Sequence, residues 1–118
     1  MISCKMAVEE LRTVKDYRDL LAESMFFHAL NQRFFKLSRK KDPPYFSCSA
    51  AADVLVHPCK AYIMTSSCKE KGTIEALKSM LTEVCLFCDL IYVLIIHLSD
   101  TFHFRLLGFV CMGSLNVR

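Results

Sequence analysis

The chain has 118 residues, a formal net charge of +3 and a hydrophobic share of 53%. This length allows one small domain or part of a larger one. The hydrophobic share exceeds the globular average, so some segment is deeply buried or faces a membrane. The charge is weaker and less clustered than a nucleic-acid-binding protein normally carries, so we expect no nucleic acid partner.

A helix is predicted over residues 13–41. Thr13 and Asp16 have the spacing of a capping box, and Pro43 and Pro44 stop the helix. Two apolar rows follow at helical spacing: Val14, Tyr17, Leu21, Met25 and His28 in the first, and Leu20, Phe27, Leu30 and Phe34 in the second. We therefore expect this helix to be covered on more than one side, with His28 as a core histidine.

Two extended runs, residues 45–56 and 60–68, flank the turn signal His57-Pro58 and predict an antiparallel hairpin. Within it, Ala50-Ala51-Ala52 is weak strand material. A second helix is predicted over residues 73–84, with Glu75 in its first turn. The order helix, strand, strand, helix predicts an α+β fold.

Charge density drops sharply after residue 83. Residues 1–83 carry 13 basic and 10 acidic side chains, whereas residues 84–118 carry two of each. We therefore expect an apolar, helical tail over residues 85–118 that is unrelated to the preceding domain. Such a change is typical of an incomplete or misjoined gene, and removing everything after Val84 is expected to raise the soluble yield.

Several segments between residues 9 and 84 resemble one known family of enzymes. They are Arg18–Leu21, Leu30–Phe34, Ser38–Ser47, Lys60–Tyr62 and Lys69–Leu77. These segments are similar to the insulinase and processing-peptidase family of zinc metallopeptidases, in particular to its PqqL-like members. The resemblance implies the second, non-zinc domain of such an enzyme, with an antiparallel-sheet α/β roll of which residues 9–84 form only a part.

The residues that would carry the chemistry of this family are absent. Its catalytic zinc is held by His-x-x-Glu-His on a helix, with the glutamate activating the metal-bound water. The four histidines, His28, His57, His97 and His103, neither begin nor end that motif. We therefore assign no catalytic, cofactor-binding or metal-ligating residue, expect no cofactor in this chain, and expect it to be inactive by itself.

Cys85-x-x-Cys88 with His97 and His103 has the only metal-like spacing in the sequence. A two-Cys, two-His finger needs about twelve residues between its pairs, and here eight apolar-rich residues intervene. We therefore favour a structural role for these residues. The seven cysteines, without a secretory signal, indicate reduced thiols in an intracellular protein.

Two further groups have ordinary structural explanations. Lys36 and the run Ser38–Lys41 could contact an acidic membrane or nucleic acid, but cations also complement the C-terminal dipole of a helix. Ser24 and His28 lie one helical turn apart without a third residue to orient them, which argues against a nucleophile.

The favoured function is a truncated, non-catalytic domain of an insulinase-type zinc metalloendopeptidase. Its expected partners are the missing peptidase domains, with peptide substrates bound only by an intact enzyme, and the resemblance allows an organellar location. The alternative is a small membrane-associated protein anchored by residues 84–113. Fifteen residues from Val84 to Leu98 would reach about 22 Å as a helix, against a hydrocarbon core of about 30 Å, so insertion is marginal.

Overall fold

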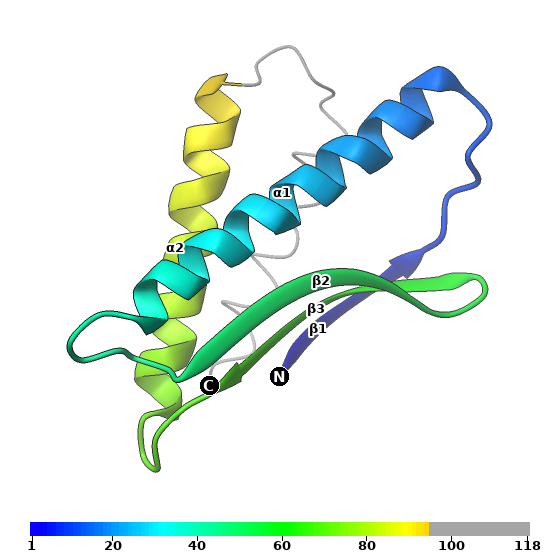
Figure 1. The fold of residues 1–118 in the computed structure, drawn as a ribbon. Coiled ribbons are helices and arrows are strands. Elements are labelled where there is room, and N and C mark those ends of the chain that lie inside the picture. The colour runs from blue at the N-terminus through cyan, green and yellow to red at the C-terminus, as the bar shows by residue number, and fades with distance from the viewer. Residues whose placement is uncertain (95–118) are drawn as a thin grey trace.

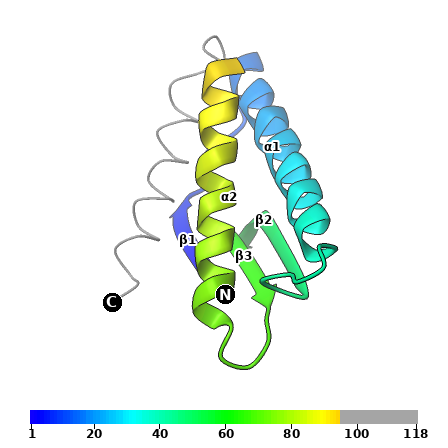
Figure 2. The same ribbon diagram turned by 90° about the vertical axis from the view of Figure 1, so that its left-hand side faces the viewer.

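The computed structural model describes the backbone of residues 1–94 and the side chains of residues 1–90. The elements in chain order are β1 (Ile2–Ala7), α1 (Val14–Ser38), β2 (Ser47–Val56), β3 (Cys59–Ser67) and α2 (Thr73–Leu94). The three strands form an antiparallel sheet in the order β1-β3-β2. Both helices pack on one face of this sheet (Figure 1; Figure 2). The predicted α+β class is confirmed.

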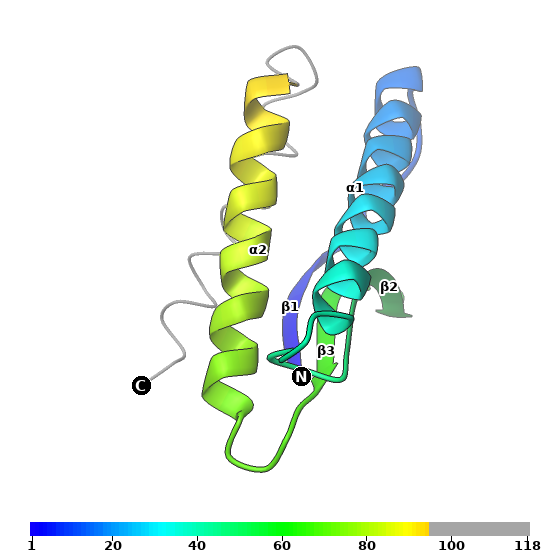
Figure 3. The same ribbon diagram turned by 60° about the vertical axis from the view of Figure 1, so that its left-hand side comes forward.

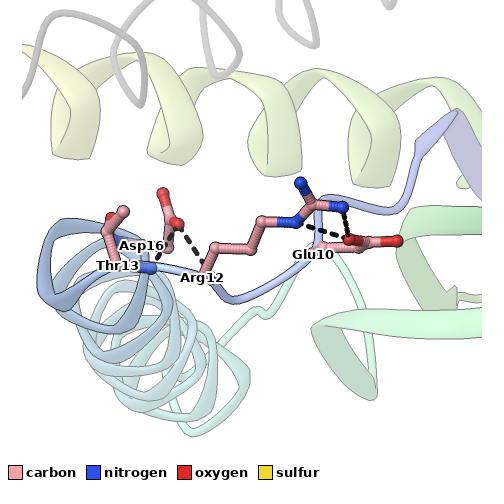
Figure 4. Close-up of polar contacts among 4 residues, drawn as sticks. All are labelled: Glu10, Arg12, Thr13 and Asp16. Carbon is pink, nitrogen blue, oxygen red and sulfur yellow. Dashed lines mark hydrogen bonds and ion pairs between the residues drawn. The ribbon is translucent and has the colours of Figure 1, made fainter.

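Helix α1 begins where the capping box was predicted. The Thr13 side chain accepts a hydrogen bond from the Asp16 amide, and the Asp16 carboxylate accepts from the backbone amides of Thr13 and Arg12 at 2.9 and 3.1 Å (Figure 4). These bonds satisfy amides that have no partner inside the helix. The helix ends at Ser38, three residues before the predicted end, where the Lys40 amide donates to the Leu37 carbonyl in a tight turn.

The predicted hairpin is confirmed, and alanine is tolerated in its first strand. Strands β2 and β3 pair in an antiparallel register with Ala51 opposite Ile63. The Asn31 side chain on α1 both donates to and accepts from the backbone of Ala50, each at 2.8 Å. These two hydrogen bonds, called the Asn31 clamp below, and the pairing with β3 compensate for the low strand propensity of the alanines.

Strand β1 was not predicted. It pairs with β3 so that Cys4 lies opposite Tyr62, and its side chains alternate between half-buried and exposed. Ile2, Cys4 and Met6 face the core, as the period of a strand requires.

The core lies between the two helices and the inner face of the sheet. Its largest fully buried side chains are Leu30, Phe34, Tyr45, Tyr62, Met64 and Val84. Helix α2 continues ten residues beyond its predicted end at residue 84, because Phe87 and Cys88 still pack in this core. Residues 85–94 of the predicted tail therefore extend α2, and residues 95–118 lie outside the described residues.

Within the described residues, neither helix combines the length and the apolar character needed to cross a bilayer. Most of the membrane anchor considered above, residues 95–113, lies outside this part of the chain.

Candidate functional site

The histidines considered from sequence do not form a site within the described residues. His28 is exposed, so the prediction of a core histidine is wrong. It follows the buried Phe26 by two residues, which places it about 200° around the helix and on the opposite side. Ser24 and His57 are exposed as well. His97 and His103 lie outside the described residues.

The Cys-x-x-Cys pair lies on α2 with Cys88 turned into the core. Burial raises the pKa of the Cys88 thiol to about 12, with smaller contributions from Cys85 and Asp89. A thiol that stays protonated is a poor nucleophile and a poor metal ligand. Among residues 1–90 no cluster of three or more His, Cys, Asp or Glu side chains is arranged to hold a metal ion.

A cavity of about 300 Å³ lies between the first half of α1 and the end of the sheet that holds Ala7, Val54 and Lys60. It is lined mainly by acidic and apolar side chains: Ala7, Val8, Glu9, Leu11, Asp16, Asp19, Leu20, Glu23, Ala52, Val54 and Lys60. Four carboxylates face one ammonium group here, so the cavity is acidic. Since it contains the most deeply buried charge in the described structure, it is the best candidate for a functional site.

That buried charge is Glu23, whose exposed fraction is 7%. One of its oxygens, Oε2, accepts a hydrogen bond from the Tyr62 hydroxyl at 2.7 Å, and the other, Oε1, forms an ion pair with Lys60. Burial, and the hydrogen bond to Glu23, raise the pKa of Tyr62 well above its usual value of 10.0. The tyrosine therefore remains a neutral donor.

Both oxygens of Glu23 have a partner, which fixes the position of the carboxylate. Each oxygen still has a further lone pair, but the carboxylate is fixed between the Lys60 ammonium group and the Tyr62 hydroxyl. Asp16 accepts backbone hydrogen bonds from Arg12 and Thr13 at its Oδ2 atom, and these bonds lower its pKa. The Glu23–Lys60–Tyr62 network, called the polar pin below, therefore joins α1 to β3.

The contacts among Glu23, Lys60 and Tyr62 were not predicted from the sequence. Glu23 lies three residues before Phe26 and seven before Leu30, so it shares the inward side of α1. An acidic residue among the apolar residues of one helix face is a signal that could have indicated a buried ion pair. Its partners Lys60 and Tyr62 lie 37 and 39 residues later in the sequence, beyond the reach of local patterns.

A second polar contact fixes the two helices relative to each other. Arg33 Nε donates to Glu83 Oε2 at 2.8 Å, and the Arg33 guanidinium carbon lies 5.9 Å from the centre of the Phe87 ring. The Phe26 and Phe87 rings are 5.3 Å apart. Charge pairing and aromatic packing therefore join α1 to α2, which lie side by side in Figure 3.

Comparison with known proteins supports the resemblance predicted from sequence. A stretch of 56 residues is 77% identical to a protein of Arabidopsis thaliana described as "Zinc protease PQQL-like". This stretch is 48% of the present chain but 6% of that relative. No protein-family profile and no solved structure matches the chain. The predicted resemblance to PqqL-like peptidases is thus confirmed for about half of the chain.

Proposed function

We propose that this chain is a truncated, non-catalytic domain of a PqqL-like zinc metallopeptidase and acts as a scaffold. The observation that carries this proposal is the 77% identity over 56 residues to a zinc protease. Identity of that level is expected to preserve fold and packing. It says nothing by itself of activity, because the match covers 6% of the relative.

The composition of the chain supports the non-catalytic part of the proposal. No His-x-x-Glu-His occurs anywhere in the 118 residues, and a catalytic zinc needs such ligands on one helix face. The most buried charges satisfy one another in the Glu23–Lys60–Tyr62 pin. Such a domain contributes shape and stability, while the hydrolytic chemistry belongs to a separate zinc domain.

The sheet supports the proposed partners, which are the missing domains of a peptidase. Within the described residues, β1 and β2 each pair on one side only. Open edges of this kind can receive further strands, as a larger roll would require. Peptide substrates would then meet this domain only inside an assembled enzyme, in an intracellular compartment.

A chimera tests the proposal directly. The 56 matched residues of the Arabidopsis relative are replaced by those of this chain, and peptide hydrolysis is measured. The proposal predicts a soluble chimera with activity close to that of the parent. A chimera that is insoluble or inactive would contradict it, and a scrambled 56-residue insert serves as the negative control.

A further inference from the structure

Helix α1 has a second apolar face that points away from its own core. Its inward side is formed by the buried residues Phe26, Leu30 and Phe34. The first apolar row predicted from sequence lies on the other side. The exposed fractions in this outer seam are 79% for Val14, 56% for Tyr17, 48% for Leu21, 72% for Met25 and 53% for Phe35.

The position of this outer seam follows from helix geometry. Tyr17 and Phe35 are each nine residues from Phe26, which places them about 180° around the helix from it. In Figures 1 and 2 no described element covers this side of α1. The described fold therefore leaves the seam without cover, although the sequence predicted cover on more than one side.

The spacing of the seam favours a helix as the covering element. Val14, Tyr17, Leu21 and Met25 follow one another at steps of three or four residues, and Phe35 continues this side of the helix beyond the polar His28. This is the pattern of residues that interlock with a second helix along a shared seam. From Val14 to Phe35 the seam runs about 31 Å.

The charges beside the seam specify the partner further. All three acids of α1, namely Asp16, Asp19 and Glu23, lie on the cavity side. The bases Arg18 and Lys36 are 7 and 11 residues from Met25, so both lie along the same edge of the seam. The Arg39 guanidinium carbon lies 4.2 Å from the centre of the Phe35 ring. No ion pair among the described residues uses these three bases.

We propose that the outer seam of α1 is a docking surface for an amphipathic helix of another polypeptide, with an apolar stripe and an acidic flank. A second copy of this chain is a poor match, because it would place its own basic flank against this one. An acidic flank instead complements Arg18, Lys36 and Arg39. The inference rests on α1 alone and goes beyond the proposed peptidase origin.

The test uses the full chain and a designed helical peptide with leucine at the a and d positions and glutamate at e and g. A matched peptide carries lysine at e and g. We expect the acidic peptide to bind, more weakly as salt increases, and the basic peptide to bind at least about tenfold more weakly. Fluorescence anisotropy of the labelled peptides gives both affinities.

Two sets of variants locate the binding surface. Leu21→Glu with Met25→Glu should weaken binding of the acidic peptide at least about tenfold, whereas Ile74→Glu on α2, where Ile74 is 75% exposed, should leave it unchanged. Arg18→Glu with Lys36→Glu should reverse the preference toward the basic peptide. Because this reversal is a gain of binding, it cannot result from unfolding.

Several results would overturn the proposal. They are equal binding of both peptides, no binding of either, unchanged binding by the Leu21→Glu, Met25→Glu variant, and no reversal by the charge variant. Self-association in sedimentation velocity that the Leu21→Glu, Met25→Glu variant abolishes would identify a second copy as the occupant. Seam-dependent binding to phosphatidylserine vesicles without binding of the acidic peptide would identify a membrane surface.

Discussion

At the scale of single residues, the most unusual side chain is Glu23, a buried carboxylate. A carboxylate with 7% exposure is costly unless it is paired and hydrogen-bonded. Lys60 supplies the charge and Tyr62 the hydrogen bond, from a strand that follows α1 by more than 20 residues. These contacts fix the position of the Glu23 carboxylate and join α1 to β3.

Tyr62→Phe should destabilise the fold by about 1–3 kcal/mol, because it leaves one buried oxygen of Glu23 without a donor. The free energy of unfolding in urea measures this loss. Tyr17→Phe is the matched control, since Tyr17 is 56% exposed and should change stability by less than about 0.5 kcal/mol. Equal effects of the two substitutions would argue against the polar pin.

Asp16 should make the start of α1 sensitive to acid. Backbone hydrogen bonds lower its pKa below 3.8 in the folded chain, so its contribution to stability is present above the unfolded pKa of about 3.9. The contribution is lost as the pH falls through the lower folded pKa. Asp16→Ala should remove this part of the acid dependence below about pH 4, measured by circular dichroism; an unchanged acid transition would contradict the capping role.

Burial should also protect two thiols. The pKa values of Cys48 and Cys88 are raised to about 12 by burial, so roughly 0.01% of each is thiolate at pH 8. We expect iodoacetamide to modify both at least about a hundredfold more slowly in the folded chain than in urea, by mass spectrometry. Comparable rates in the two conditions would show that the fold does not shield the half-buried Cys48 and the buried Cys88.

At the scale of elements, the local patterns were good guides to what forms and poorer guides to where it ends. The capping box and the proline turn predicted α1 and the β2–β3 hairpin within a few residues. Strand β1 was missed because its six residues pair with a strand more than 50 residues away. The end of α2 was placed too early, because a fall in charge was interpreted as a boundary where Phe87 continues the core.

Asn31 is the element-scale residue whose loss should matter most. Asn31→Ala removes both hydrogen bonds to the Ala50 backbone, and we expect a loss of about 1–3 kcal/mol. The Ala50 amide should also exchange with solvent faster. Asn31→Asp keeps an acceptor for that amide and should lose less; if both variants match the wild type, the clamp does not hold β2.

At the scale of the whole molecule, the sequence predicted the fold class and the resemblance to a zinc peptidase, but it did not predict the polar contacts between elements. The Glu23–Lys60–Tyr62 pin and the Arg33–Glu83 pair join residues 37 to 50 positions apart. No periodic pattern connects such positions. The outer seam of α1, by contrast, was visible as an apolar row, and only the structure showed that it is exposed.

Two shortened chains distinguish the contribution of the end of α2 to stability from that of the residues after Leu94. A chain ending at Val84 loses Phe87 from the core, and deleting a buried phenylalanine typically costs about 3–5 kcal/mol. We therefore expect loss of α1 helicity in that chain. A chain ending at Leu94 should keep its helicity and, if residues 95–118 are unrelated to the domain, should be more soluble than the full chain. Equal behaviour of the two would contradict the assignment of Phe87 to the core.

The central claim, that this chain contributes scaffold without hydrolytic chemistry, is tested most directly by peptide cleavage. The purified full chain is incubated with an unstructured fluorogenic peptide and added zinc, with and without a chelator. We expect no turnover above that of the peptide alone in either condition. Cleavage that the chelator abolishes and zinc restores would contradict it, because the 118 residues contain no His-x-x-Glu-His to hold the metal.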